Sequence, residues 1–213
     1  MTNPKSSIAL VVCNAPLPPQ ALLHDILRLQ PLIICADGGA DRLRRRGMEP
    51  DYIVGDLDSL SKQTQCALAA AKIIKVSDQE STDLEKALDF ALSHGISRAT
   101  VTGATGRRLD HTFANFSILL KYHQKMTLTF LDVHCTVQMI TGDNRLNIPK
   151  GTIVSLMPMG RCEGIVTEGL AYPLQDEPLE LGVREGLSNV VVSSPVHIHV
   201  GKGFLSLFIV HKK

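Results

Sequence analysis

Four short segments rich in aspartate and glycine each follow a run of apolar residues in the first 125 positions of the chain. They occupy residues 37–40, 55–59, 77–83 and 103–111. Their residue types suit the binding of a cation beside a phosphate group. The carboxylate oxygens of Asp56, Asp58 and Asp83 are hard ligands of the kind that Mg²⁺ takes in small number, leaving its other positions to water and phosphate.

Glycines and an arginine in the same segments suit the binding of an anion. Gly38, Gly39, Gly103 and Gly106 carry no side chain, so backbone N–H groups can approach a phosphate closely at the start of a helix. Arg108 offers a planar pair of donors for phosphate. Together these groups indicate a site for a magnesium–nucleotide complex. The patterns GxxxxGK[ST] and GxGxxG are both absent, which disfavours a P-loop kinase and a dehydrogenase.

Each of these features also has a purely structural interpretation. Asp56 and Asp58 can form an Asx turn, and Asp83 in the first turn of a helix complements the helix dipole. Arg108 and Asp110 can form a surface ion pair worth about 0–1 kcal/mol. The convergence of all four segments on one edge of a sheet favours the binding interpretation.

The periodicity of the first 125 residues predicts the elements that position these groups. Apolar and β-branched runs predict strands at residues 8–13, 32–36, 52–54, 72–76 and 99–102. Apolar residues at helical spacing predict helices at residues 19–29, 82–93 and 110–122, the second opening with a Thr82 and Glu85 capping box. The alternation predicts a mainly parallel sheet with helices on both faces. Ligands bind beyond the carboxyl ends of such strands, so the four segments are expected to meet there.

Helical periodicity stops near Lys125. Beyond it, short strands are expected at residues 127–132, 136–141, 152–157, 164–168, 188–193, 196–200 and 204–210, separated by turn residues. This pattern is typical of a small all-β sandwich or barrel. We therefore expect an α/β domain over residues 1–125 and an all-β domain over residues 126–213.

Composition excludes several classes of protein. The 213 residues are 44% hydrophobic and 20% charged, which is globular rather than disordered or fibrous. A net charge of +1 creates no overall field toward nucleic acid or an anionic membrane. No apolar run reaches the roughly 18–20 residues of a membrane span, and the N-terminus lacks the pattern of a signal peptide. Five cysteines without a CxxC pair predict neither disulfides nor a zinc site. We expect a cytoplasmic protein.

Taken together, the segments resemble thiamine pyrophosphokinases of the bacterial type. In the first domain the resemblance rests on residues 35–40, 50–59, 81–88, 103–106 and 108–115, which read CADGGA, PDYIVGDLDS, STDLEKAL, GATG and RLDHTFAN. In the second it rests on residues 155–158, 169–174 and 186–189, which read SLMP, GLAYPL and GLSN. The matching segments are spread over nearly the whole chain.

The resemblance implies transfer of pyrophosphate from ATP to the hydroxyl of thiamine, giving thiamine diphosphate and AMP, with Mg²⁺ required. It implies a homodimer in which the β domain helps to bind thiamine. By matching motifs, the metal ligands would be Asp56, Asp58 and Asp83. Nucleotide or phosphate would be held by Asp37, Gly38, Gly39, Thr82, Lys86, Gly103, Arg108, Asp110 and His111, and the thiamine pyrimidine by Ser188 and Asn189. Asp37 and Asp83 are alternative acceptors for the hydroxyl proton.

The chain departs from the family pattern at three points. Asp41 stands where the family usually has asparagine, and no tryptophan is available to stack on thiamine. Arg107 replaces the second of two glycines that usually precede the arginine of the Arg-x-Asp-His segment. Its side chain either reaches phosphate or points to solvent.

Other signals are weaker. His197 and His199 share one face of a predicted strand without an evident third metal ligand, and the arginines at 42 and 44–46 suit a solvated helix C-terminus. Two alternatives to the kinase remain. One is a nucleotide- or thiamine-sensing module without turnover, and the other is a different Asp-x-Asp metal-dependent phosphoryl or glycosyl transferase.

Overall fold

The computed structural model describes residues 7–68 and 70–211, and the chain divides into two compact units between Val133 and His134. The sequence pattern predicted this boundary earlier, near residue 125. The first unit continues further because β6 (Thr127–Leu131) pairs in parallel with β5 (Arg98–Thr102) and extends its sheet. The N-terminal residues before Ser7, which enter the expectation about a signal peptide, lie outside the described residues.

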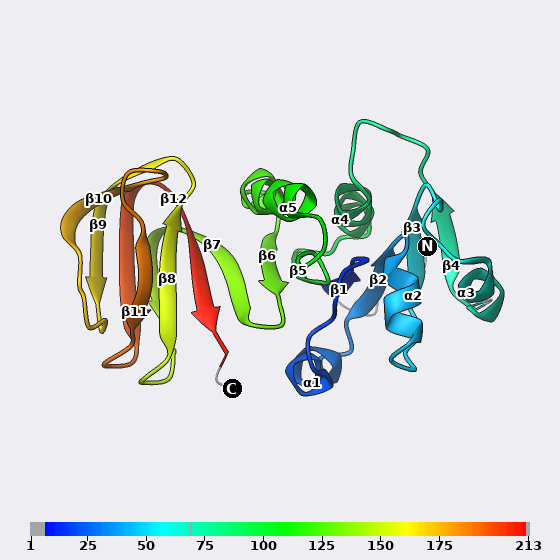
Figure 1. Ribbon diagram of the computed structural model, residues 1–213, viewed down its shortest axis with the longest axis horizontal. Helices are drawn as coiled ribbons and strands as arrows, with labels where there is room; N and C mark the ends of the chain where they lie inside the picture. The colour runs from blue at the N-terminus through cyan, green and yellow to red at the C-terminus, as the bar shows by residue number, and fades with distance from the viewer. Residues whose placement is uncertain (1–6, 69, 212–213) are drawn as a thin grey trace. The chain divides into compact units, whose positions relative to one another are not determined.

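The first unit contains a parallel sheet, as expected for an α/β fold (Figure 1). Its other strands are β1 (Ile8–Val12), β2 (Leu32–Ala36), β3 (Tyr52–Gly55) and β4 (Lys72–Lys75). The order across the unit is β6-β5-β1-β2-β3-β4, and every pairing is parallel. The residues Leu10, Val11 and Val12 in the centre are fully buried, which explains their continuous apolar run.

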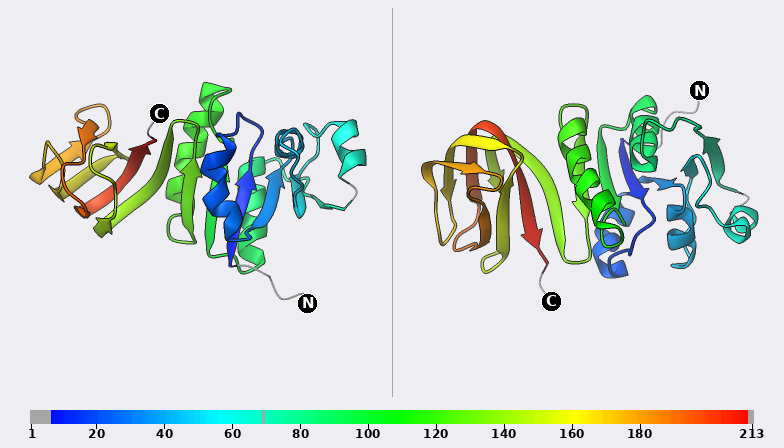
Figure 2. Two further views of the ribbon diagram at one scale, coloured as in Figure 1. Left: turned by 90° about the horizontal axis from the view of Figure 1, so that it is seen from below. Right: turned by 45° about the horizontal axis from the view of Figure 1, so that its top comes forward.

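Helices cover both faces of this sheet (Figure 2). They are α1 (Gln20–Arg28), α2 (Gly39–Arg44), α3 (Lys62–Ala67), α4 (Asp83–Ser93) and α5 (Leu109–Tyr122). Leu10 and Val12 of β1 pack with Leu23 of α1 and Leu43 of α2 in one apolar cluster, while α4 and α5 lie on the opposite face. The sequence pattern did not predict α3, because six residues are too few to show helical periodicity.

The order of strands creates a crevice beside β1. The chain runs from β1 through β2 and β3 to β4 on one side, then returns to place β5 and β6 on the other side. The loops after β1 and β5 therefore leave the sheet in opposite directions. In open parallel sheets this divergence opens a binding crevice at the carboxyl ends of the strands.

The start of α4 is fixed by a capping box. The Thr82 hydroxyl accepts a hydrogen bond from the Glu85 backbone N–H at 3.3 Å, and the Glu85 carboxylate accepts one from the Thr82 backbone N–H at 2.9 Å. Glu85 also forms an ion pair of 2.6 Å with Lys121 of α5. The cap places Asp83 at the first position of α4. The ion pair with Lys121 connects α4 to α5.

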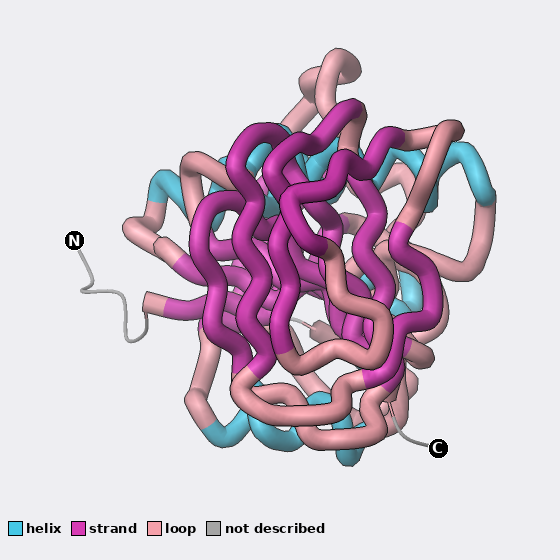
Figure 3. Tube along the Cα trace, turned by 90° about the vertical axis from the view of Figure 1, so that its left-hand side faces the viewer, coloured by secondary structure: helices cyan, strands magenta, loops and turns pink. Residues whose placement is uncertain are grey.

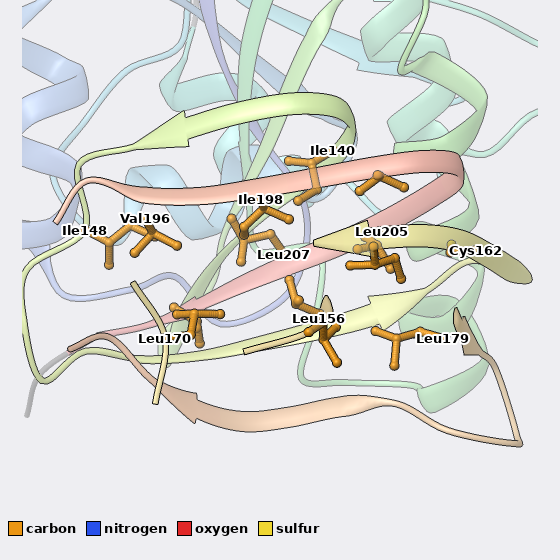
Figure 4. Packing of buried hydrophobic residues seen from close by; sticks show 14 of the residues in the cluster. Ile140, Ile148, Leu156, Cys162, Leu170, Leu179, Val196, Ile198, Leu205 and Leu207 are labelled. Atoms are coloured by element: carbon orange, nitrogen blue, oxygen red, sulfur yellow. The ribbon is translucent and has the colours of Figure 1, made fainter. Parts of the chain in front are cut away.

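The second unit is all-β. Its strands are β7 (Cys135–Leu146), β8 (Ile153–Pro158), β9 (Arg161–Glu168), β10 (Gln175–Glu180), β11 (Gly186–Val190) and β12 (Val196–Val210). These strands lie side by side around one apolar core (Figures 3 and 4). The sequence pattern did not predict β10, whose residues QDEPLE contain three acids and a proline.

The strands expected at 196–200 and 204–210 are wrong as separate elements, because they form the single strand β12. Its first part pairs with β7 and β9, and its second part pairs with β7 and β8, with a shift in register between Val200 and Leu205. Gly203 adopts a φ of +96° in this interval, a conformation that favours glycine. The glycines thus bend one strand rather than ending it, and Ile198, Leu205 and Leu207 all reach the core (Figure 4).

Among the described residues, none of the helices is both long and apolar enough to cross a membrane.

We predict that Thr82→Ala lowers the free energy of unfolding by about 1 kcal/mol, because the α4 N–H groups lose their side-chain acceptor. Thr82→Ser keeps the hydroxyl and should retain most of the stability. Urea denaturation of the two variants and the wild type measures the difference. Equal stability of Thr82→Ala and the wild type would contradict the capping role.

Candidate active site

A cavity of about 440 Å³ opens at the crevice beside β1. It is lined by the loops after β1, β2, β3, β4 and β5 and by residues of α4 and α5. Its polar lining includes Asn14, Asp56, Thr82, Asp83, Lys86, Arg107, Arg108 and His111. The sheet edge that the sequence predicted as a binding site is therefore hollow, and it is large enough for a small-molecule ligand.

Three carboxylates gather beside this cavity. Asp37, Asp56 and Asp58 each place one oxygen within 4.8 Å of the others. Asp37 follows β2, whereas Asp56 and Asp58 follow the neighbouring strand β3. Gly55 permits their approach, because a Cβ atom there would lie 2.9 Å from the Asp37 Cβ and 3.1 Å from Asp83 Oδ1.

Asp37 is the most constrained of the three. Its side chain is buried, and its Oδ2 accepts a hydrogen bond of 2.9 Å from the Ser59 backbone N–H. Its buried Oδ1 has no hydrogen-bond partner among the described residues. Burial raises the pKa of Asp37 to about 6; the Ser59 N–H opposes this shift, and the charges of Asp83 and Asp58 add to it.

Lys86 balances part of this negative charge. The side chain is buried, and its ammonium lies 3.5 Å from Asp56 Oδ2 and 3.4 Å from Asp83 Oδ1. Burial disfavours the charged ammonium, but Asp83 and Asp56 outweigh that effect and raise the pKa of Lys86. Burial raises the pKa of Asp83, with Lys86 acting in the opposite direction. Lys86 therefore stays charged and joins α4 to the loop after β3.

The carboxylate cluster fits a divalent cation of the hard, oxygen-binding type. Its three groups offer oxygen ligands only, and the unpartnered Asp37 Oδ1 is a buried acceptor that a cation would satisfy. The sequence predicted Asp56, Asp58 and Asp83 as ligands. The structure brings Asp56 and Asp58 together with Asp37, and it places Asp83 against Lys86.

The glycines of the loop after β2 allow very close packing. A Cβ atom on Gly39 would lie 2.0 Å from the backbone oxygen of Val12, and one on Gly38 would lie 2.3 Å from Asn14 Nδ2. Gly103 has a φ of +68°, and a Cβ atom there would lie 2.6 Å from the backbone oxygen of Cys13. These glycines draw the loops after β2 and β5 onto the loop after β1, and Gly38 and Gly103 line the cavity.

The segment that opens α5 presents an internal ion pair. Arg108 Nε and Nη2 donate to the two carboxylate oxygens of Asp110 at 3.1 and 2.5 Å. Arg108 and His111 line the cavity, and Thr82 lines it from the start of α4. The predicted phosphate-binding residue Arg108 is thus at the expected place, but its guanidinium already has a carboxylate partner.

Sequence reasoning missed the loop after β1. Cys13, Asn14 and Ala15 all line the cavity. The residues carry no acidic or glycine signal, and only their position at the end of the first strand could have drawn attention to them. The central place of β1 in the sheet gives that position its importance.

Ser188 and Asn189 lie in the second unit, on β11. Ser188 adopts a φ of +56°, and its N–H donates to Ser155 Oγ at 3.0 Å. The Asn189 side chain accepts from the Tyr172 N–H at 3.0 Å and donates to the Tyr172 carbonyl at 2.6 Å. Asn189 thus holds the loop that carries Tyr172, whose side chain is exposed.

The two weaker signals have local partners. His197 Nε2 and His199 Nδ1 lie 3.1 and 2.9 Å from the same Asp143 oxygen. The arginine run belongs to the end of α2 and the turn that follows it, and Arg42 points its Nε toward Asn14 Oδ1 at 3.2 Å. Arg42 therefore reaches the cavity edge instead of lying wholly in solvent.

Comparisons with known proteins agree with this architecture. Residues 23–131 match the family model "Thiamin pyrophosphokinase, catalytic domain", and residues 138–205 match "Thiamin pyrophosphokinase, vitamin B1 binding domain". The chain is 29% identical to thiamine pyrophosphokinase 2 of Oryza sativa subsp. japonica, covering 92% of this chain and 84% of that protein. It is 30% identical to thiamin pyrophosphokinase 1 of Caenorhabditis elegans, covering 78% and 73%. The crystal structure of thiamine pyrophosphokinase from Bacillus subtilis superposes with a TM-score of 0.86 at 25% identity, covering 97% of this chain and all of that one.

We predict that Asp37→Asn stabilises the metal-free protein at neutral pH. A pKa raised from 3.8 to about 6 means that the charged Asp37 opposes folding above pH 6, and that this cost disappears as pH falls below 4. The variant should gain about 2–3 kcal/mol over the wild type at pH 7.5. The gain should shrink toward zero at pH 4.

Urea denaturation in the presence of a chelator, at both pH values, measures this difference. Asp25→Asn is the control, because this α1 carboxylate has a side chain that is 92% exposed. A gain for Asp37→Asn that is the same at both pH values would contradict the burial of a charged Asp37.

Proposed function

The chain belongs to the thiamin pyrophosphokinase family, and from this premise we propose that it transfers a pyrophosphoryl group from ATP to the hydroxyl of thiamine, releasing AMP. One observation carries the proposal: the cavity with its carboxylate cluster lies wholly within the unit that the catalytic-domain family matches. The match to both family domains favours this activity over a sensing module without turnover and over another Asp-x-Asp transferase.

We propose Mg²⁺ as the cation of the carboxylate cluster. Asp37, Asp56 and Asp58 would hold it. Asp83 would lie near this site, because Lys86 pairs with both Asp83 and Asp56. When bound, the ion would supply charge neutralisation for the triphosphate. The all-oxygen ligand set and the small number of protein ligands support Mg²⁺ over a softer metal.

The residues of this chain would mainly position the substrates. Gly38 and Gly103 line the cavity, and their N–H groups are candidates to meet the polyphosphate at the ends of the strands. Gly39 lets the same loop pack on the backbone of Val12. Lys86 fixes Asp56 and Asp83 in one arrangement before a substrate arrives. Such preorganisation matters because phosphoryl transfer depends on in-line placement and charge stabilisation more than on covalent work by the protein.

The thiamine hydroxyl must lose a proton as it attacks the β-phosphorus. Asp37 and Asp83 are both suited to accept it, since burial raises the pKa of each carboxylate toward the range useful for a base. The two differ in their surroundings. The proposed cation would take the unpartnered Oδ1 of Asp37, whereas Asp83 faces Lys86.

We further propose that the second unit contributes to thiamine binding and that the protein is a homodimer. The match of residues 138–205 to a vitamin B1 binding domain supports the first point and includes Ser188 and Asn189. Leu109 and Phe113 on α5 support the second, because they are 85% and 74% exposed beside the cavity residues of that helix. A cytoplasmic location is supported by the five cysteines, all of which are free thiols.

Incubation with ATP, Mg²⁺ and thiamine tests the reaction, with the nucleotide products separated by ion-exchange chromatography. We expect AMP and thiamine diphosphate in equal amounts. ADP with thiamine monophosphate would overturn pyrophosphoryl transfer and indicate an ordinary kinase. Binding of both substrates without any AMP would indicate a sensing module.

We predict that Asp56→Asn lowers kcat by about 100-fold or more while the protein remains folded, because the cluster loses a charged ligand and Lys86 loses a partner. Asp25→Asn is a matched control, since Asp25 is an acid of α1 whose side chain is 92% exposed and which lies outside the cavity lining. Steady-state kinetics at saturating Mg²⁺ makes the comparison. Near-normal turnover by Asp56→Asn would contradict the proposal that Asp56 binds the cation.

A further inference from the structure

Two arginines from different loops meet on Asn14. Arg42 of α2 donates its Nε–H to Asn14 Oδ1 at 3.2 Å, and Arg107 of the loop after β5 donates from Nη1 to the Asn14 carbonyl at 3.1 Å. Asn14 itself follows β1, at the point where the sheet opens. Asn14 thus accepts hydrogen bonds from two guanidinium groups at the edge of the crevice.

No acid forms an ion pair with either member of this pair. Among the described residues, neither Arg42 nor Arg107 has a carboxylate oxygen within 4.0 Å of its guanidinium nitrogens. Burial lowers the pKa of Arg42, the charges of Arg107 and Arg45 lower it further, and the charge of Asp41 acts in the opposite direction. The Asp41 oxygens accept hydrogen bonds from the side chain and backbone of Ser61 rather than from Arg42.

Arg108 differs from Arg107 in this respect. Both line the cavity, but the Arg108 guanidinium donates twice to the Asp110 carboxylate, which balances its charge. Arg107 donates only to a carbonyl oxygen in the contacts described. The Arg107 guanidinium is therefore a positive group without a carboxylate partner that an anion entering the cavity can contact.

The pair also adjoins the glycine turn after β2. A Cβ atom on Gly38 would lie 2.3 Å from Asn14 Nδ2, so Asn14 packs directly on the turn that follows Asp37. Asn14 and Arg107 line the same cavity as Gly38 and Asp56, and Arg42 reaches the edge of that cavity through Asn14. Two like charges held together without a counter-ion are stabilised by an anion with several charged oxygens.

We propose that Arg107 and Arg42, held together by Asn14, form a binding subsite for the phosphate chain of the nucleotide. This inference rests on the proposed function and names the residue that strengthens nucleotide binding in this chain. Asn14 acts as a positioning residue, because it touches the arginines and sets where their guanidinium groups lie.

The test is the variant Arg107→Gln, with Arg107→Lys and Arg45→Gln beside it. Losing a charge-assisted contact to phosphate should raise the KM for ATP roughly tenfold or more. The KM for thiamine and the thermal unfolding midpoint should stay unchanged. Arg107→Lys should recover part of the affinity for ATP. Arg45→Gln should change the KM for ATP less than about twofold, because Arg45 is exposed and acts on Arg42 through charge alone.

An unchanged KM for ATP in Arg107→Gln would overturn the subsite. A parallel rise in both KM values with a lower unfolding midpoint would also overturn it, because the residue would then only support the loop. Calorimetric titration with ATP separates this inference from the proposed activity. If the wild type releases no AMP, the activity fails, and weaker ATP binding by Arg107→Gln would still support the subsite.

Discussion

The repulsion among carboxylates at the ends of β2 and β3 is the constraint on which the site depends. Asp37, Asp56 and Asp58 lie close enough to share a cation, and burial alone makes the charge on Asp37 costly. The Ser59 N–H offsets part of that cost at Asp37. The Asp58 N–H and the Lys86 ammonium act on Asp56 instead and lower the pKa of that carboxyl. The remainder is the driving force for binding a cation, since one buried Asp37 oxygen still lacks a partner.

This arrangement needs the fold to bring loops together more tightly than side chains would allow. Gly39 lies against the backbone of Val12, and Gly103 lies against that of Cys13. Both contacts lie at the end of β1 or directly after it, and the strand order places β1 in the centre of the parallel sheet. The glycines thus serve packing, and Gly103 also lines the cavity.

The sequence predicted those parts of the structure that are encoded locally. The Thr82 and Glu85 cap and the parallel α/β order follow from spacing within one segment, and both were found. The grouping of Asp37 with Asp56 depends on which strands are neighbours, so no pattern within one segment predicted it. The metal-binding role expected for Asp83 stays a prediction. Asn14 carries no motif, and its importance follows only from the divergence of loops beside β1. The sequence pattern predicted two strands where the structure has the single strand β12, because glycine within a strand indicates either a turn or a bend.

The distribution of charge in the crevice bears on which form of the nucleotide can enter. Asp37, Asp56 and Asp58 repel a bare polyphosphate, whereas the uncompensated guanidinium of Arg107 attracts it. A free triphosphate would therefore gain at one side of the crevice and lose at the other. A cation-bound triphosphate gains at both, because the same carboxylates then act as ligands. In the proposed reaction these opposed groups would favour the complexed form of the nucleotide without any contact to its base. A chain with a net charge of only +1 would then select a small polyanion through local charge alone.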